Sequence, residues 1–284
     1  MTTALVIVLF HPSDDDINHL MHVSQLYPGV IVDNSEEQLF KTQHVHQMEY
    51  LSLGSNTGIA HAQNVGVQYI LEHYNTNHIV FMDQDSRWED GYVQEIAAEY
   101  DSLCQKGIKL SALGPTVYRR DSGEEYKSVI HKKQFLNNDF ILRKHIISSG
   151  CCIGTSLFKE VGGFEDALFI DFVDDEWCWR ANAKGYVCGI SPHISLTHTI
   201  GRKEIHFGKY TVIVSAPFRY YYLYRNYLVL IRRGYVPTQW KISYGVKFFA
   251  RFFYFPVFVD SGRECWKFMW RGIKDGIKGL TCTE

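Results

Sequence analysis

The sequence lacks the features that mark several specialised classes of protein. No uncharged apolar run reaches the roughly 18 residues that a membrane-spanning helix needs. There is no internal repeat and no low-complexity tract, and only 7 of the 284 residues are proline. The N-terminal residues have neither a basic cluster nor a small-residue cleavage site, so no signal peptide is expected. With 46% hydrophobic residues, the chain can build one substantial core, as a large single domain or a domain with an appendage.

Cysteine is present without the spacing of metal ligands. The seven cysteines are an odd number, and most of them lie in apolar contexts. Cys151 and Cys152 are adjacent, which is a poor geometry for a bond between them. We therefore expect reduced thiols in a cytosolic protein, and no zinc site.

Charge is distributed unevenly along the chain. Residues 218–284 contain 12 Lys and Arg against 4 Asp and Glu, a net charge of +8, whereas the remainder has 17 against 27, a net charge of −10. In the same C-terminal section, aromatic side chains alternate with Arg and Lys at helical spacing. This pattern suits helices against an anionic membrane surface, or else core packing or a homodimer interface. The acidic body and the lack of a nucleic-acid-binding motif argue against a nucleic-acid partner.

Short apolar runs with polar ends predict an α/β fold. Leu5–Phe10 and Val30–Val32 are typical of buried parallel strands, and a predicted helix separates them. The second run ends in Asp33, and ligands of such sheets bind beyond the carboxyl ends of the strands. Met48–Leu53 predicts a third strand, which the glycine-containing helix start Gly54–Gly66 follows. That segment matches neither a Walker nor a dinucleotide-binding glycine pattern.

The centre of the pattern is the stretch from His78 to Ser86. The apolar run Ile79–Met82 predicts a buried strand, and it ends in two carboxylates one residue apart, Asp83 and Asp85. Residues i and i+2 of an extended chain point to the same side, so both carboxylates face one point beyond the strand. Paired oxygen ligands of this kind suit Mg²⁺ or Mn²⁺ bound to a diphosphate. The alternative is a core strand whose acids only begin a loop.

A second acidic group lies further along the chain. It consists of four acids within six positions: Asp171, Asp174, Asp175 and Glu176. On a helix that starts near Asp174, these acids would favour the helix dipole, which is a purely structural explanation. The apolar neighbours would also raise the pKa of a carboxyl group, which suits a general base.

Two later segments are less informative. Residues 119–138 are polar and weakly patterned, which predicts a loop over the site. Gly185–Ile190 predicts an edge strand, and His193 and His198 follow it. A histidine at such a position is usually structural, so His198 gains a ligand role only if it lies near the metal.

These stretches occur in an order that resembles one known family. The segments that carry the resemblance are Val32–Ser35, Asn56–Ala60, Asn64–Gly66, Asp83–Asp85, Gly162–Phe164, Asp171–Arg180 and His198–Gly201. The ordered set closely resembles the family 2 inverting glycosyltransferases of the GT-A fold, especially the bacterial rhamnosyltransferases of O-antigen and cell-wall polysaccharide assembly. The resemblance covers residues 4–230.

The resemblance implies a particular fold and domain organisation. The expected fold is α/β of the GT-A (nucleotide-diphospho-sugar transferase) type, with a mostly parallel central sheet flanked by helices. Residues 1–217 would form the catalytic domain, with nucleotide-sugar binding in 1–115 and acceptor binding and catalysis in 116–217. Residues 218–284 would form a helical aromatic and basic appendage that associates with a membrane or forms a dimer.

Carried over residue by residue, the resemblance assigns a donor site. Phe10, His11 and Pro12 would border the nucleotide, and Asp33 would hydrogen-bond the pyrimidine ring with Asn34 beside it. The further residues implied in substrate binding are Asn56, Gly58, Ala60, Asn64, Asp83, Trp177 and Arg225.

The same comparison assigns the catalytic and metal-binding groups. Asp85 would be the direct ligand of Mg²⁺ or Mn²⁺, with Asp83 and His198 as further ligands. Asp174 would deprotonate the acceptor hydroxyl. Many family members carry Glu before this aspartate, whereas Val173 stands here, so the neighbouring Asp175 competes for the role.

The implied activity is transfer of L-rhamnose from dTDP-L-rhamnose to a sugar hydroxyl of a lipid-linked O-antigen or cell-wall precursor. One displacement would invert the anomeric centre while the metal acts as a Lewis acid. The enzyme would be cytoplasmic and peripheral on the inner face of the bacterial cytoplasmic membrane. An alternative is a transferase of the same fold that uses UDP-galactofuranose or another UDP-hexose. A remoter alternative is a non-catalytic nucleotide-sugar-binding scaffold subunit.

Overall fold

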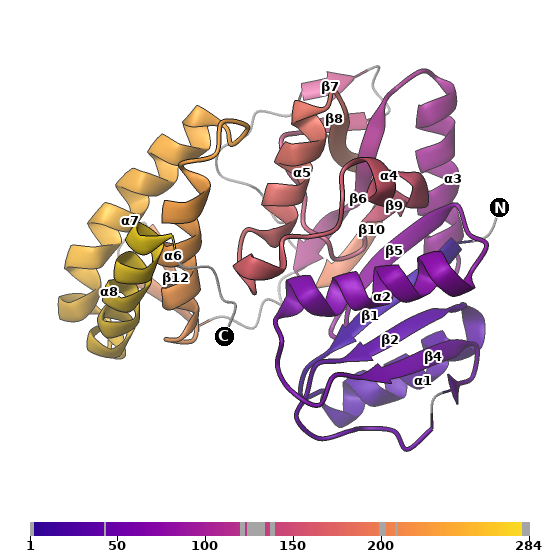
Figure 1. Ribbon diagram of the computed structural model, residues 1–284, viewed down its shortest axis with the longest axis horizontal. Helices are drawn as coiled ribbons and strands as arrows, with labels where there is room; N and C mark the ends of the chain where they lie inside the picture. Colours follow the sequence, from indigo (N-terminus) through magenta and orange to yellow (C-terminus); the bar gives the residue numbers. More distant parts are fainter. Residues whose placement is uncertain are drawn as a thin grey trace.

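A mixed β-sheet forms the centre of the molecule (Figure 1). The computed structural model describes residues 3–42, 44–119, 123, 134–136, 140–198, 203–207 and 210–279. Within these residues, ten strands form one sheet in the order β3-β4-β2-β1-β5-β9-β6-β10-β8-β7. Its inner strands are β4 (Met48–Ser52), β2 (Gly29–Asp33), β1 (Thr3–Leu9), β5 (His78–Asp83), β9 (Cys152–Gly154), β6 (Leu110–Arg119), β10 (Val187–His198) and β8 (Phe140–Arg143). The outermost strands are β3 (His44–Val45) and β7 (Gln134–Leu136), and a separate hairpin consists of β11 (Lys203–Phe207) and β12 (Tyr210–Val214).

The main strands run parallel, as the sequence predicts. β1 pairs in parallel with β2 and with β5, and β2 pairs in parallel with β4. β6 and β10 are parallel to each other, and the short antiparallel β9 joins β5 to β6. The carboxyl ends of β4, β2, β1 and β5 therefore meet one edge of the sheet, where ligands of open α/β sheets bind.

Alternation along the strands builds a core on each face of the sheet. Leu5, Ile7 and Leu9 of β1 contribute to one core, whereas the intervening residues of the same strand contribute to the other. The helices α1 (Asp14–Leu26) and α3 (Tyr92–Gln105) cover the first face. The second face is covered by α2 (Ile59–His73), α4 (Thr155–Glu160) and α5 (Val173–Ala183).

The prediction of an edge strand at residues 185–190 is wrong. β10 begins at Val187 and lies inside the sheet, between β6 on one side and the antiparallel β8 on the other. A Cβ atom at Gly189 would lie 2.3 Å from the carbonyl oxygen of Ile141 and 2.5 Å from the ring of Phe140. The glycine therefore marks close packing between strands, and not the absence of a neighbour.

Residues 119–138, predicted as a loop, lie mostly outside the described residues. The structure describes positions 119, 123 and 134–136, and the last three form β7.

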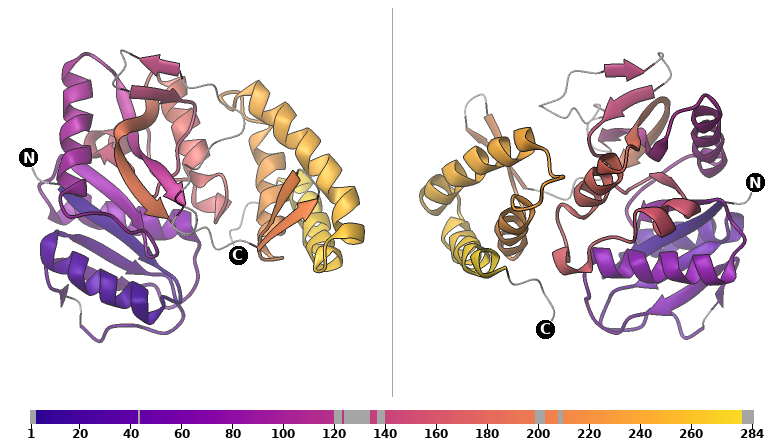
Figure 2. Two further views of the ribbon diagram at one scale, coloured as in Figure 1. Left: turned by 180° about the vertical axis from the view of Figure 1, so that it is seen from behind. Right: turned by 45° about the horizontal axis from the view of Figure 1, so that its top comes forward.

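Three helices after residue 218 form the predicted appendage. They are α6 (Arg219–Leu230), α7 (Thr238–Phe258) and α8 (Gly262–Lys278), and they lie beside α5 on one side of the sheet domain (Figures 1 and 2). Trp240 of α7 packs edge-on against Phe172 and Trp179, with ring centroids 5.0 and 4.8 Å apart. The appendage thus extends the core on the α5 face of the sheet. No helix in the described part of the chain is long and apolar enough to cross a membrane.

Two glycines of α8 allow this helix to approach α6 closely. A Cβ atom at Gly272 would lie 2.3 Å from the carbonyl oxygen of Tyr221, and one at Gly276 would lie 3.0 Å from that of Arg225. The first separation is much shorter than any ordinary van der Waals contact, so a side chain at Gly272 would force the two backbones apart.

We expect Gly272→Ala to lower the free energy of unfolding by about 1–3 kcal/mol, the usual effect of overpacking. Gly234→Ala is the matched control, because nothing lies within 4 Å of a Cβ atom at that position. Urea unfolding of both variants measures the difference. A Gly272→Ala protein as stable as the wild type would contradict the close approach of α6 and α8.

Candidate active site

The loops after β1 and β5 are joined at the carboxyl edge of the sheet. The main-chain N–H of Phe10 donates to Oε1 of Gln84 at 2.7 Å, and Nε2 of Gln84 donates back to the carbonyl of Phe10 at 3.2 Å. Gln84 lies between Asp83 and Asp85, so this pair of bonds fixes the position of the paired carboxylates relative to β1. Asp83 ends β5, and both carboxylates are partly exposed.

The loop after β2 joins the same cluster. The main-chain N–H of His11, the residue before the half-buried Pro12, donates to Oγ of Ser35 at 3.0 Å. Asp33 is fully buried, and it accepts bonds from the Tyr50 hydroxyl at 2.5 Å and from the Ser35 N–H at 3.0 Å. Burial and the bond to Asp33 raise the pKa of Tyr50 to about 12, so this phenol stays protonated and donates. In this structure Asp33 therefore organises the loop that follows its strand.

Asparagines connect β2 to the start of α2. The Thr57 N–H donates to Oδ1 of Asn34 at 2.8 Å, and Oδ1 of Asn56 accepts from Asn34 at 3.2 Å and from the Gly58 N–H at 3.1 Å. Gly58 has a φ of 87°, and a Cβ atom there would lie 2.7 Å from the ring of Phe169. Only glycine lets the chain adopt this backbone and pass so close to residue 169.

Residues 59–64 face the segment before α5. Ala60 is fully buried, and its N–H donates to the carbonyl of Phe169 at 3.4 Å. Asn64 donates to the carbonyl of Phe164 at 2.8 Å and accepts from the N–H of the same residue at 2.8 Å. In this structure Ala60 and Asn64 join the first turns of α2 to residues 164–169.

Asp174 and Asp175 lie at the N-terminus of α5, as the sequence predicts. The Ser148 N–H donates to Oδ2 of Asp174 at 3.0 Å, and the Asp175 N–H donates to Oδ1 at 3.1 Å. Desolvation raises the pKa of each carboxyl group to about 7, with the charge of Asp175 adding to the shift at Asp174 and that of Asp171 to the shift at Asp175. A carboxyl with this pKa can accept a proton near neutral pH.

The metal-binding prediction is met only in part. Asp83 and Asp85 offer carboxylate oxygens at the open edge of the sheet, which are the ligands that Mg²⁺ and Mn²⁺ prefer. The main chain of Arg87, two residues after Asp85, bonds to that of Thr197 at 3.2 Å. This bond brings the end of β10 close to the paired acids, and His198 is the last residue of that strand. The structure describes the main chain of His198 and not its side chain. Among the described residues, no group of three or more ligand side chains could hold a metal ion.

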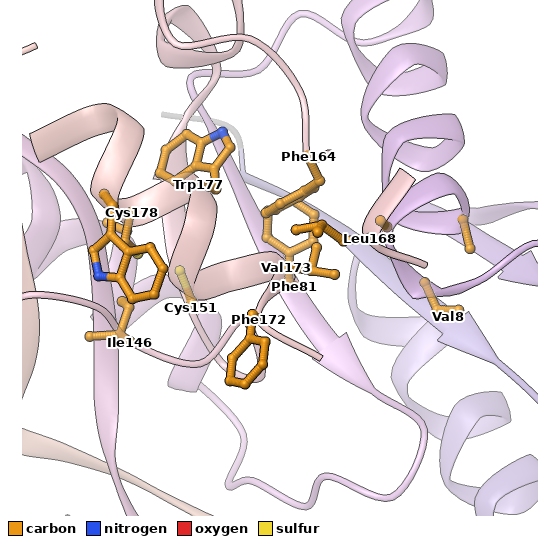
Figure 3. Packing of buried hydrophobic residues seen from close by; sticks show 14 of the residues in the cluster. Val8, Phe81, Ile146, Cys151, Phe164, Leu168, Phe172, Val173, Trp177 and Cys178 are labelled. Carbon is orange, nitrogen blue, oxygen red and sulfur yellow. The ribbon is translucent and has the colours of Figure 1, made fainter. Parts of the chain in front are cut away.

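Two predicted substrate-binding side chains are instead buried structural groups. Trp177 is only 1% exposed, and its indole N–H donates to the carbonyl of Gly162 at 2.8 Å within the core (Figure 3). Arg225 is fully buried, and it donates to the carbonyls of Ala167 at 2.7 Å and Leu168 at 3.0 Å. Because both side chains are enclosed by the protein and bonded to main-chain carbonyls, neither is exposed to a ligand, and both assignments are corrected.

The segment before α5 has an unusual backbone. Phe169, Asp171 and Phe172 have φ angles of 64°, 68° and 65°, a region that residues other than glycine rarely adopt. Such a conformation costs of order 1–3 kcal/mol per residue and persists only where the surroundings impose it. The segment ends two residues before Asp174, so its shape determines where that carboxyl group lies.

Helix α6 imposes this shape. Nδ2 of Asn226 donates to the carbonyls of Leu168 at 2.9 Å, Ile170 at 2.9 Å and Asp171 at 3.1 Å. Arg219 forms a two-point ion pair with Asp171, and the ring of Tyr222 stacks on that of Phe169 with centroids 4.6 Å apart. No sequence motif identified Arg219 or Tyr222, and the only available signal was the Arg-Asn pair at residues 225 and 226.

We expect Asp174→Asn to change how stability depends on pH. A carboxyl whose pKa is raised on folding stabilises the folded state below its unfolded pKa, and this contribution is lost as pH rises through the folded pKa of about 7. The variant should therefore have a higher Tm than the wild type at pH 8, by at least about 2–4 °C, the shift for 1 kcal/mol in a protein of this size. The difference should disappear near pH 4.

Asp90→Asn is the matched control, since its carboxyl is 80% exposed. Thermal unfolding from pH 4 to pH 8 should give the same profile for this control and the wild type. If Asp174→Asn also showed the wild-type dependence of Tm on pH, the raised pKa of Asp174 would be contradicted.

Comparison with known proteins identifies relatives along the whole chain. No family model matches the sequence. The dTDP-rhamnosyl transferase RfbF of Shigella flexneri is 30% identical over 97% of this chain and 95% of its own length. The low-salt glycan biosynthesis hexosyltransferase Agl10 of Haloferax volcanii is 21% identical over 68% of this chain and 66% of its own length.

Solved structures share the fold at low sequence identity. S. aureus TarS superposes with a TM-score of 0.59 and 14% identity over 99% of this chain, which spans 50% of that protein. GalNAc-T7, solved with UDP, GalNAc and Mn²⁺, has a TM-score of 0.55 and 13% identity over 95% of this chain and 55% of its own. The relative that matches along nearly the full length, together with the strand-end acids and this shared fold, shows that the chain belongs to the family 2 glycosyltransferases of the GT-A fold.

Proposed function

We propose that this glycosyltransferase moves L-rhamnose from dTDP-L-rhamnose to a sugar hydroxyl of a lipid-linked O-antigen or cell-wall polysaccharide precursor. The donor assignment is supported by the near full-length similarity to a protein described as a dTDP-rhamnosyl transferase. A UDP-hexose donor such as UDP-galactofuranose is the alternative, and the similarity to a hexosyltransferase favours keeping it under test. A non-catalytic scaffold role is disfavoured, because the chain retains Asp83, Asp85 and Asp174.

The observation that carries the catalytic proposal is the pair of partly buried carboxyls at the start of α5. Asp174 is held by two main-chain N–H donors, and its pKa of about 7 lets it remove a proton from an acceptor hydroxyl at neutral pH. Within the described part of the chain Asp175 has no such pair of donors, and its carboxylate lies 3.9 Å from Nδ1 of His145. Asp174 is therefore the base in this proposal, and Asp175 helps to raise its pKa. The displacement proceeds with inversion of the anomeric centre.

In this proposal the nucleotide-sugar donor binds at the carboxyl ends of β1, β2 and β5. Phe10 is 41% exposed beside the loop of Asp33 and Asn34, where the nucleotide base would lie. Asp85 and Asp83, with His198 at the end of β10, would hold Mg²⁺ or Mn²⁺. The metal, when bound, neutralises the departing diphosphate. Asn226 and Arg219 are positioning residues, because they hold the segment that leads to Asp174.

We expect Asp174→Asn to lower kcat by about 10²–10⁴, the usual contribution of a general base, while the Kd for donor changes little. Asp175→Asn should lower kcat less and shift the acidic limb of the pH profile to lower pH, since it removes a neighbouring charge. Radiolabelled sugar transfer and donor calorimetry measure the two quantities. A larger loss of kcat in Asp175→Asn would transfer the role of base to that residue.

The donor is tested by calorimetry with a panel of dTDP- and UDP-sugars, with and without Mn²⁺. We expect binding of dTDP-L-rhamnose that is selective, and that weakens at least about tenfold in Asp85→Asn, because a metal ligand is lost. Asp90→Asn again serves as the control for loss of an exposed carboxyl. Tighter binding of a UDP-sugar would leave the fold and the base in place but would overturn the rhamnosyl assignment.

The positioning role of α6 is tested by Asn226→Ala. The substitution removes one donor from each of three carbonyls, although Leu168 keeps its bond from Arg225, so kcat should fall at least tenfold with little change in donor Kd. Gln239→Ala, at an exposed position on α7, is the control. Equal losses of donor binding and kcat would show that Asn226 acts on the donor side instead.

A further inference from the structure

The outward surface of α7 is unusually apolar for a water-exposed helix. Five side chains recur at the spacing of one helical face, and each is at least 60% exposed: Ile242 at 64%, Val246 at 67%, Phe249 at 70%, Phe253 at 60% and Val257 at 73%. A contiguous apolar surface of this kind marks an interaction site in most proteins. We call these five residues the α7 ridge.

The inward side of the same helix is already used. Trp240, Phe248 and Phe255 are buried against the rest of the appendage and α5. The ridge is therefore not the core-facing stripe of an amphipathic helix, because α7 has a separate buried stripe on its other side.

Basic and indole side chains from α8 border the ridge. Trp266 and Trp270 are 37% and 46% exposed and stack in parallel, with ring centroids 6.4 Å apart. A groove of about 460 Å³ lies between the two helices. It is lined by Phe252, Phe253, Pro256, Arg263, Trp266 and Lys267. An apolar floor with basic groups at its rim matches an anionic lipid, whose chain is apolar and whose head group is negative.

The charge of the appendage decides between a membrane and a second copy of the chain. Residues 238–279 contain eight Lys and Arg against three Asp and Glu, a net charge of +5. Two such surfaces would repel each other, whereas the inner leaflet of a membrane carries negative charge. Tryptophan is also enriched at the boundary between head groups and acyl chains.

We propose that the α7 ridge, with Trp266, Trp270, Arg263 and Lys267 of α8, inserts into the surface of an anionic bilayer. The helices lie in the plane of the interface, since no described helix is long and apolar enough to span it. The proposal names the surface that would bring the enzyme to its lipid-linked acceptor. It rests on the proposed function, which supplies that acceptor.

The test uses flotation of the full-length protein with vesicles of phosphatidylcholine, with or without about 30% phosphatidylglycerol to mimic an anionic leaflet. We expect binding to the anionic vesicles only. Phe249→Ser combined with Phe253→Ser should weaken binding at least tenfold. Leu26→Ser combined with Ile147→Ser, at exposed apolar positions of 41% and 43% elsewhere, should leave it unchanged. Removal of whole helices is unsuitable, because Phe255 and Met269 are buried in the core.

The electrostatic part has its own pair of variants. Arg263→Glu combined with Lys267→Glu should weaken binding to anionic vesicles at least about thirtyfold, because two attractive basic groups near the surface are replaced by acids that the surface repels. Lys41→Glu combined with Lys159→Glu changes the net charge equally at exposed positions outside the appendage, and should have little effect.

Three outcomes would overturn the proposal. They are no binding of the wild type to anionic vesicles, full binding by the Phe249 and Phe253 variant, and a lipid-free dimer in sedimentation that this variant dissociates. The last result would assign the ridge to a second copy of the chain. Vesicle binding requires neither donor nor acceptor, and donor calorimetry requires no vesicle, so this proposal and the rhamnosyl assignment can fail independently.

Discussion

The hydrogen bonds from Asn226 to the carbonyls of Leu168, Ile170 and Asp171 are the contacts on which the site depends. This short segment has three residues with positive φ, and it touches Gly58 at the start of α2 while it leads into Asp174 of α5. Such a backbone conformation is not stable by itself, so it needs hydrogen-bond donors from another part of the chain that bond to its carbonyl oxygens. One amide side chain of α6 therefore helps to set the position of Asp174 relative to Gly58.

Partial burial of two acids side by side opposes folding at neutral pH and gives both carboxyl groups the pKa that a general base needs. Both Asp174 and Asp175 have a pKa near 7 because they are removed from water, and their mutual charge adds to the effect at Asp174. The main-chain donors from Ser148 and Asp175 limit this rise, because they stabilise the ionised form of Asp174. The balance leaves a group that is ready to accept a proton and is fixed in one orientation.

The C-terminal helices have two different faces and two different roles. Their inner side, through Arg225, Asn226 and Trp240, completes the core and holds the segment before α5. Their outer side leaves the α7 ridge in water, where a monomer gains nothing from it. Because the same three helices carry both faces, a protein held at a membrane through α7 keeps its catalytic acids at a fixed distance from that surface.

The sequence by itself determined the parallel strands, the acids at their ends and the helix start at Asp174, because these depend on local alternation and on residues close together in the chain. Only the tertiary structure decided that β10 lies inside the sheet, since its partners are nearly 50 and 80 residues away. It also decided that Trp177 and Arg225 are buried, and that Asn226 supports the segment before α5. A side chain's exposure and its distant partners are set by packing between elements, which no local pattern of residue types encodes.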